Sequence, residues 1–410
     1  MKSHWHTHKI FNQLIFSLIT AYIIFFPIKF DLAKNIIYMI VILFPVSFIL
    51  NRNKKFFYDT SLIIMLFFLS TLVFSFFNVP HELLGTAGNG LRKALISTIF
   101  ALAIAHCVNS EKKMIYVIAS ICVAYLIYDF SIFYQYLFHP KIHQLGIIRA
   151  SGFSDHPNVS SVNLCAHAFL FLCLGFFYFE KYKGLFLKIL ALGSIIAITI
   201  TFSRGGAIAI VITSSLLFCL KRSWKLCAAG VVTIIICISL LPQGVTKWIK
   251  YAESPSHLYL GGYNQFGGDE SQRLNQWKAA LNAIRQHPLL GIGINTFPSE
   301  YPQYKVVPDP LIKTWVHNAF LEHLAETGIF GFIALCILII FLYKRVIKVY
   351  TTSSSKFYNI LSLGLGLSLT AYLIHSITEP TLQLWRTATT FWFLAGLIIA
   401  LHKLNFNNQS

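Results

Sequence analysis

Twelve long apolar runs divide this 410-residue sequence, and they constrain its fold more than any other feature. The hydrocarbon core of a bilayer is about 30 Å thick, which a helix of about 20 residues can cross. The runs are rich in Ile, Leu and Phe on every side and show no period of two, so they predict helices and not the strands of an outer-membrane barrel. The predicted spans are Ile10–Phe26, Asn35–Leu50, Ser61–Phe77, Ala94–Cys107, Met114–Leu137, Ser160–Phe179, Leu185–Thr201, Ala207–Leu220, Leu226–Leu241, Ile329–Leu342, Tyr358–Ile377 and Thr387–Leu401.

The charge content excludes a soluble enzyme and says little about a polyanionic partner. Only 12% of the residues are charged, against about 25% in ordinary soluble domains. The formal net charge is +18, which in a soluble protein would suggest nucleic acid as a partner. Here the bases are spread thinly between apolar runs, so membrane lipids and not nucleic acid are the expected surroundings.

The distribution of bases predicts the topology. If the first residues are cytoplasmic, 18 bases fall on the cytoplasmic side and eight in the short outer loops. By the positive-inside rule both termini are then cytoplasmic. We therefore expect an all-α integral membrane protein of about twelve transmembrane helices, with one long outer loop between spans nine and ten. The expected domains are a membrane part over 1–241, the outer loop over 242–328 and a second membrane part over 329–410.

The long outer loop carries two helical patterns. Apolar residues recur at helical spacing between Ser271 and Gln286, which predicts an amphipathic helix with Trp277 facing the membrane surface. The segment from Trp315 to Gly328 is also helical in pattern and leads directly into span ten.

Arg204 interrupts an apolar stretch at the outer junction of spans seven and eight. A guanidinium at the edge of hydrocarbon is costly and usually needs an anionic partner. Its planar fork of donors suits phosphate oxygens, and the adjacent Gly205 and Gly206 would let a phosphate or a neighbouring helix approach closely. A snorkelling residue in a turn is the alternative interpretation.

Arg273 and His317 are predicted to lie on the same side of the membrane as Arg204, at about the same depth. Taken singly, an arginine such as Arg273 is more often a solvated helix charge, and a histidine such as His317 is more often a structural or interfacial imidazole. Taken together, two guanidiniums could neutralise a pyrophosphate, and a neutral imidazole can accept a proton from an attacking hydroxyl.

Other polar residues are weaker candidates. Asp129 is an acid inside predicted span five, and such residues are functional candidates by default. His317 and His323 are six residues apart and do not match the spacing of a helical zinc site. The sequence contains neither a phosphate loop nor a metal motif, so neither a nucleotide-driven pump nor a metal site is predicted.

The order of several short motifs resembles the O-antigen ligase family, with its relatives the O-antigen polymerases and the bacterial protein O-oligosaccharyltransferases. The resemblance covers residues 155 to 345 best, with the long outer loop in the expected place. The matching motifs are Asp155-His156-Pro157-Asn158, Ser203-Arg204-Gly205-Gly206, Arg273 with Trp277, Pro288-Leu289-Leu290-Gly291-Ile292-Gly293, and His317 to Glu322 continued by Glu326 to Gly331.

The resemblance implies a glycosyltransferase of the bacterial inner membrane whose active site faces the periplasm. Such an enzyme takes its glycan from undecaprenyl diphosphate and needs no cofactor, metal or nucleotide. Carried over to this sequence, Arg204 and Arg273 would bind the donor diphosphate, and His317 would activate an acceptor hydroxyl that attacks the sugar carbon with inversion. The supporting positions would be Asn318, Trp277, His156, Asn158 and Glu326.

Within the family, one long outer loop and two short ones favour the ligase that joins O-antigen to lipid A-core. A polymerase often has a second sizeable outer loop, and protein-glycosylating relatives are commonly longer at the C-terminus. A polysaccharide or lipid transporter is the alternative from another class. It should show polar residues in the middle of several spans, whereas Asp129 is the clear mid-span acid here.

Overall fold

The computed structural model describes residues 2–51, 59–139, 149–222, 270–306 and 311–407, and these residues form helices and turns without a strand. Short 3-10 turns at Ser75–Asn78 and His81–Leu83 join two of the helices. The helices are α1 (Lys2–Ile28), α2 (Phe30–Asn51), α3 (Thr60–Phe74), α4 (Leu84–Cys107), α5 (Glu111–Phe138), α6 (Pro157–Phe177), α7 (Lys181–Ile200), α8 (Arg204–Lys221), α12 (Glu270–Gln286), α13 (Phe297–Tyr304), α14 (Ala319–Thr352), α15 (Lys356–Ser376) and α16 (Trp385–Asn407).

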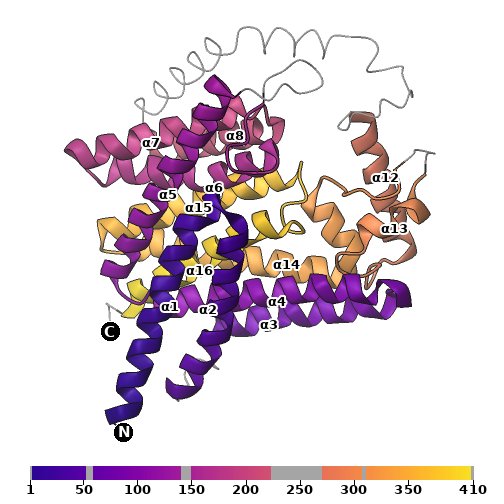
Figure 1. Ribbon diagram of the computed structural model, residues 1–410, viewed down its shortest axis with the longest axis horizontal. Coiled ribbons are helices and arrows are strands. Elements are labelled where there is room, and N and C mark those ends of the chain that lie inside the picture. The colour runs from indigo at the N-terminus through magenta and orange to yellow at the C-terminus, as the bar shows by residue number, and fades with distance from the viewer. Residues whose placement is uncertain (1, 52–58, 140–148, 223–269, 307–310, 408–410) are drawn as a thin grey trace.

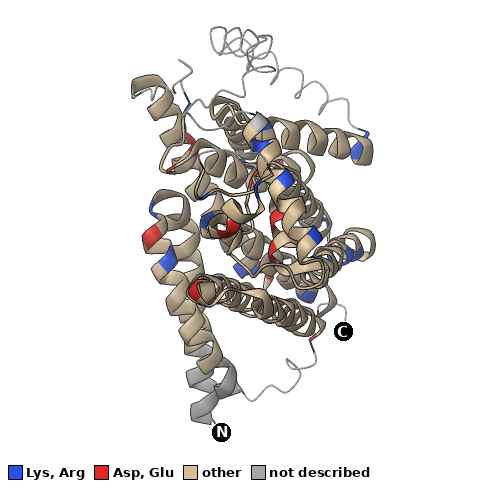
Figure 2. Ribbon diagram, turned by 90° about the vertical axis from the view of Figure 1, so that its right-hand side faces the viewer, with Lys and Arg blue, Asp and Glu red and all other residues tan. Residues whose placement is uncertain are grey.

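Eleven of the described helical segments are long and apolar enough to cross a membrane, so the chain is an all-helical multi-pass membrane protein. Each matches one of the predicted spans. The predicted ninth span, Leu226–Leu241, and the Gly-rich stretch at 261–268 lie outside the described residues. Figure 2 shows that Lys, Arg, Asp and Glu positions are sparse along the described helices, as expected of helices in hydrocarbon.

Two spans extend well beyond their apolar runs. Helix α4 begins at Leu84, ten residues before the predicted Ala94, because its first turns contain glycines and bases that interrupt the run but not the helix. Helix α14 continues to Thr352, past the predicted Leu342, through a segment that carries Lys344 and Arg345. Hydropathy therefore marks the part of a helix that lies in hydrocarbon and underestimates its length.

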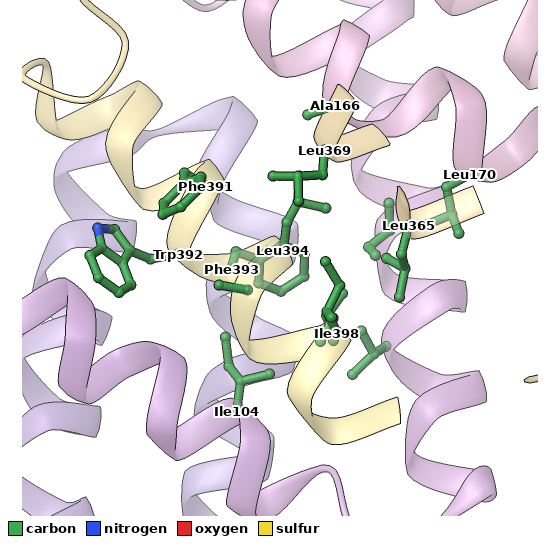
Figure 3. Close-up of a cluster of buried hydrophobic side chains, with 14 of the residues drawn as sticks. Ile104, Ala166, Leu170, Leu365, Leu369, Phe391, Trp392, Phe393, Leu394 and Ile398 are labelled. Atoms are coloured by element: carbon green, nitrogen blue, oxygen red, sulfur yellow. The ribbon is translucent and has the colours of Figure 1, made fainter. Parts of the chain in front are cut away.

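Helix α16 lies at the centre of the bundle and organises the core. It packs against α4, α6, α14 and α15, and almost all of its residues are buried. Figure 3 shows Phe391, Leu394 and Ile398 of α16 among side chains such as Ile104 of α4 and Leu369 of α15. Helix α8, by contrast, is mostly exposed, as expected of a helix at the edge of a bundle in lipid.

A second, smaller core packs α12, α13 and the start of α14 together. Helix α12 contacts α13 and the start of α14, and these elements stand together at the right of Figure 1. Trp277 and Ile284 of α12 pack against this small core, while Leu274 and Leu281 are exposed. The small core therefore takes up half of the predicted apolar stripe, and its placement on the membrane surface stays a prediction. The buried residues of this core are Ala279, Ala280, Ala283, Ile292, Phe297, Tyr301, Tyr304, Val316 and Ala325.

Backbone hydrogen bonds join the small core to the membrane bundle. Helix α14 breaks at Gly328, whose φ is +64°. The segment after α12 runs alongside the break, with the Ile292 and Gly293 amides donating to the Ala325 and Glu326 carbonyls at 3.0 and 2.8 Å, and the Ile329 amide donating to the Pro288 carbonyl at 2.9 Å. A Cβ on Gly328 would lie 2.2 Å from the Leu289 carbonyl oxygen, so a glycine is required there.

Candidate active site

Glu379 is the centre of a polar cluster at one end of the bundle. It lies in the connection between α15 and α16 and is 7% exposed. Its Oε1 accepts hydrogen bonds from Asn158 Nδ2 at 2.6 Å and from Arg273 Nη2 at 3.0 Å, and its Oε2 lies 3.4 Å from His317 Nδ1. One carboxylate thus joins residues from the start of α6, from α12 and from the segment before α14.

His317 lies in a turn and not in a helix. Helix α14 begins at Ala319, so the prediction of a helix from Trp315 onward is wrong for its first four residues. Asn318 caps α14, its Oδ1 accepting from the Phe320 and Leu321 amides at 3.1 and 3.0 Å. This cap stops the helix and leaves His317 with a φ of +55°, a left-handed conformation that is costly for a residue with a side chain.

The contacts of His317 determine which of its nitrogens is available. A carboxylate only accepts hydrogen bonds, so Nδ1 carries the proton in its contact with Glu379. Nε2 is then the basic nitrogen. The backbone around His317 is held on its other side as well, because the buried Glu322 carboxylate accepts from the Val316 amide at 2.9 Å.

Arg273 enters the cluster from α12 with its guanidinium already oriented. Nη2 donates to Glu379, and Nη1 donates to the Thr378 carbonyl oxygen at 3.1 Å. Two guanidinium nitrogens of Arg273 therefore donate to the connection between α15 and α16. The small core beneath α12 sets the position of this helix, so the packing of Trp277 also determines where Arg273 lies.

Arg204 is the first residue of α8 and is exposed. Ser203 caps the helix, its Oγ accepting from the Gly206 amide at 3.3 Å. A Cβ on Gly205 would lie 2.1 Å from Thr378 Oγ1, and one on Gly206 would lie 2.0 Å from Ser161 Oγ. The glycines therefore serve the close approach of neighbouring segments, and this approach brings the start of α8 beside the Thr378–Glu379 connection.

Arg149 is a third guanidinium of the cluster, and the sequence interpretation missed it. Its Nε donates to the Thr201 carbonyl oxygen at 2.9 Å and its Nη2 to Asn158 Oδ1 at 2.7 Å. Burial lowers the pKa of Arg149, Glu379 opposes that shift, and the charges of Arg204 and Arg273 add to it. Arg149 is thus close enough to both Arg204 and Arg273 to respond to their charges.

The electrostatics of Glu379 follow from these neighbours. Burial alone would raise the pKa of this carboxyl, because a charge is costly away from water. The hydrogen bond and charge of His317 and the charge of Arg273 outweigh burial and lower the pKa of Glu379 to about 2. Glu379 is therefore a carboxylate at any physiological pH and a fixed acceptor for Arg273 and Asn158.

The five supporting positions do not all lie in the cluster. Asn158 belongs to the cluster, since its amide bridges Arg149 and Glu379, and Asn318 holds the turn that presents His317. His156 is exposed and caps α6, its Nδ1 accepting from the Asn158 amide at 3.2 Å. Trp277 packs in the small core. Glu326 is 1% exposed, and its Oε1 accepts from the Phe297 amide at 3.2 Å, apart from the arginines.

Glu379 was also missed, although two signals point to it. It follows directly after an apolar run, so it sits at a membrane boundary, and it falls on the same side as the three candidate residues. An acid there is the expected partner of an arginine at the edge of hydrocarbon. Arg149 could have been found in a similar way, because it is a base on the same predicted side and lies shortly before the Asp155–Asn158 segment.

The arrangement defines a class of site with two properties. The guanidiniums form an anion-binding surface of the kind that suits phosphate oxygens. The carboxylate and the imidazole form an oriented pair in which the imidazole can accept a proton while the carboxylate stabilises the cation that results.

Comparison with known proteins agrees with this class. Residues 189–336 match a family model described as O-Antigen ligase, which confirms the family resemblance for the motifs inside that segment; the Asp155–Asn158 motif lies before it. The matched segment contains Arg204, Arg273 and His317, while Glu379 lies beyond it. Over 182 residues the chain is 29% identical to an uncharacterized protein of Haemophilus influenzae. That alignment covers 41% of this chain and 45% of the relative, so it spans less than half the length of either protein.

Proposed function

We propose that the protein is a membrane glycosyltransferase that transfers O-antigen polysaccharide from undecaprenyl diphosphate to a sugar hydroxyl of lipid A-core. The reaction would take place at the periplasmic face of the inner membrane. The observation that carries the proposal is the position of Glu379 between Arg273 and His317, because it ties an anion-binding group and a proton-accepting group to one point.

The donor diphosphate fits the positive side of the cluster. Arg204 and Arg273 would bind its oxygens, and Arg149 would add to the positive field. In the proposed reaction no divalent cation neutralises the leaving diphosphate, so the guanidiniums stabilise the charge that develops on it. This role requires Arg204 to be exposed, as it is.

The acceptor hydroxyl would be activated by His317. Its Nε2 takes the hydroxyl proton as the acceptor oxygen attacks the anomeric carbon of the donor sugar. The bond from that carbon to the diphosphate oxygen breaks, its electron pair leaves with the lipid diphosphate, and the configuration inverts. Glu379 stabilises the imidazolium and does not itself take the proton. The 3.4 Å contact between the two side chains is of the loose kind that often tightens when substrate binds.

Two features support a ligase over its relatives. The outer connection between α3 and α4 runs only from Ser75 to Leu83, and the one between α5 and α6 is also short. The alternatives are an O-antigen polymerase or a protein O-oligosaccharyltransferase, which would use the same cluster on a different acceptor. For the transporter reading, Asp129 is the relevant residue, and its Oδ2 accepts from Ser194 Oγ at 2.9 Å between α5 and α7, away from the cluster.

Disruption of the gene, followed by gel analysis of lipopolysaccharide, tests the proposal. Loss of a ligase leaves bare lipid A-core while lipid-linked polymer accumulates on the outer side of the membrane. Loss of a polymerase leaves core with a single repeat unit, and loss of a flippase leaves bare core with the donor trapped inside. Normal surface glycan in the disrupted strain would rule out all three assignments.

A further inference from the structure

His375 is a fully buried histidine in the last turn of α15, four residues before Glu379. Its Nε2 lies 3.2 Å from Ser203 Oγ and 3.2 Å from Ser161 Oγ. A hydroxyl can both donate and accept a hydrogen bond, so either neutral tautomer of the ring can bond these partners. One imidazole nitrogen therefore joins α15 to the start of α8 and to α6.

Both serines lie next to residues of the arginine cluster. Ser203 caps α8 and directly precedes Arg204. Ser161 lies near the start of α6, three residues after Asn158. The contacts of His375 therefore hold together two segments that each bring one side chain to the site.

The backbone of His375 holds a third segment of the site. Its carbonyl oxygen accepts from the Thr378 amide and from Thr378 Oγ1, each at 3.0 Å. The Thr378 carbonyl oxygen in turn accepts from Arg273 Nη1. His375 thus contacts the same connection that receives Arg273 and carries Glu379.

Helix α8 needs such a tie, because apolar packing fixes its orientation poorly. The helix is mostly exposed, and the residues that it buries near its start are small, namely Gly205, Gly206 and Ala209. Small residues let helices approach closely but provide few of the side-chain ridges that fix the rotation of one helix against another. A directional hydrogen bond at Ser203 supplies that constraint.

Packing alone does not account for a histidine at position 375. The ring lies directly against the backbone of α8, since a Cβ on Gly205 would lie 3.2 Å from His375 Cε1. A buried polar ring is costly unless it is hydrogen-bonded, and an apolar side chain would fill the same space without that cost. The distinctive contribution of the imidazole is its pair of contacts with Ser203 and Ser161.

We propose that His375 is a positioning residue for the donor side of the site. Through Ser203 it fixes the start of α8, and with it the direction of Arg204, relative to the connection that carries Glu379. The inference rests on the proposed glycosyl transfer, in which Arg204 binds the donor diphosphate. His375 itself touches no substrate, so its loss should affect the donor and leave the acceptor unaffected.

Steady-state kinetics of the purified full chain in lipid nanodiscs test this role, with undecaprenyl-diphosphate-linked glycan and lipid A-core as substrates. His375→Leu fills the space but removes the hydrogen bonds. We expect its donor KM to rise about tenfold, as loss of one or two hydrogen bonds predicts, and kcat to fall because Arg204 also stabilises the leaving diphosphate. The acceptor KM should stay close to wild type.

Two amide variants show whether the hydrogen bond itself is responsible. His375→Gln places an amide near the position of Nε2 and should recover most of the donor affinity. His375→Asn has a similar polarity, but its amide reaches only to the position of Nδ1, so it should behave like His375→Leu. Equal donor KM values in the Gln and Asn variants would overturn the inference.

His167→Leu is the matched control for loss of a buried histidine. His167 is 3% exposed in α6, and its Nδ1 lies 2.8 Å from the Asn163 carbonyl oxygen of the same helix. This variant should leave both KM values unchanged. If His167→Leu and His375→Leu have the same donor KM, His375 has no positioning role. Should His375→Leu fail to accumulate, Ser203→Ala removes the hydroxyl on the α8 side, and an unchanged donor KM in that variant would overturn the inference equally.

Hydrogen exchange separates the positioning role from the transfer reaction. The Gly206 amide donates to Ser203 Oγ, and the Ala207 amide donates to the Ser203 carbonyl oxygen. Exchange at these amides should be about fivefold faster in His375→Leu than in wild type, and His375→Gln should restore it. Unchanged exchange in His375→Leu would overturn the inference. Faster exchange in that variant, together with no transfer by wild type, would count against the proposed function alone.

Discussion

Two carboxylates with basic partners, at opposite ends of the bundle, show how differently the same pairing can be used. Glu379 and Asp59 have nearly equal side-chain exposure, 10% and 14%, and each has a basic partner. Asp59 caps α3, accepting from the Ser61 amide at 2.8 Å, and pairs with Lys403 of α16 at 2.5 Å. Glu379 caps no helix and instead collects side chains from three distant segments.

The difference lies in what remains after pairing. Asp59 clips α16 to the start of α3, and both residues come from the side predicted to be cytoplasmic, where bases are expected from topology alone. Around Glu379 the contacts reach Arg273, His317 and, through Asn158, Arg149, so one carboxylate orients several polar groups at once. A cluster of that kind fits ligand binding, whereas a carboxylate with a single charged partner fits stability. Substitutions at the two ends should separate these roles.

The largest effect is expected from removing a group proposed to touch the substrates. Arg204→Ala or His317→Ala should abolish transfer while the protein still inserts, because loss of one preorganised charge-stabilising group costs about 10² to 10³ in rate. The measurement is glycan transfer by membranes with equal amounts of protein. Arg285→Ala and His287→Ala, at the exposed end of α12 and just after it, are matched controls. Near-normal transfer in Arg204→Ala or His317→Ala would refute the assignment.

Glu379→Gln should have the next largest effect. The amide keeps one acceptor oxygen but turns an NH₂ group toward Arg273 or toward the Nδ1–H of His317, where a donor meets a donor. We expect kcat to fall about 10- to 100-fold, in the range of a lost general-base contribution, with a smaller change in the donor KM. Glu379→Asp keeps the charge and should recover part of kcat. If Glu379→Gln retains full kcat, Glu379 does not position His317.

Gly205→Ala tests whether the approach of α8 to the α15–α16 connection matters. The added methyl would lie 2.1 Å from Thr378 Oγ1, so α8 must shift and carry Arg204 with it. Overpacking of this kind costs about 1 to 3 kcal/mol, and transfer should fall about tenfold. Gly85→Ala is the control, since a Cβ there meets nothing within 4 Å. Thermal unfolding and transfer are measured side by side for the two variants. The idea fails if Gly205→Ala has the same Tm and the same transfer rate as Gly85→Ala.

The sequence was informative where hydrocarbon imposes a rule and silent where distant segments meet. Apolar runs predicted all eleven described spans, and the helix over 270–286 followed from its periodicity. The hub at Glu379 could not be predicted, because Asn158 and Arg273 are 221 and 106 residues away from it. The turn at His317 was missed because a helix cap at Asn318 ends a pattern that otherwise looks helical. Tertiary pairing, not local propensity, assembles this site.

Acid should weaken both pairings in the same direction. Neighbouring charges lower the pKa of Glu379 to about 2 despite its burial, and Lys403 and Ser61 lower that of Asp59 despite its own. A carboxyl whose pKa is depressed by folding stabilises the protein above its unfolded pKa, about 4, and loses that contribution as pH falls through the folded value. The free energy of unfolding of wild type should therefore fall between about pH 5 and pH 2, by up to about 3 kcal/mol for Glu379. The Tm should fall over the same range. Glu379→Gln should flatten that fall, and an unchanged slope would contradict the pairing.

The smallest effect is expected at the other end of the comparison. Lys403→Ala removes the partner of Asp59 but leaves the Ser61 cap in place, so stability should fall by about 1 kcal/mol or less. Transfer should stay close to wild type, because Lys403 belongs to a pairing at the far end of the bundle from the arginines. Thermal unfolding and transfer activity of Lys403→Ala, measured beside Glu379→Gln, check both statements. A large loss of transfer without loss of protein would mean that the two ends of the bundle are coupled. The pair of Asp59 and Lys403 would then do more than hold α16 to α3.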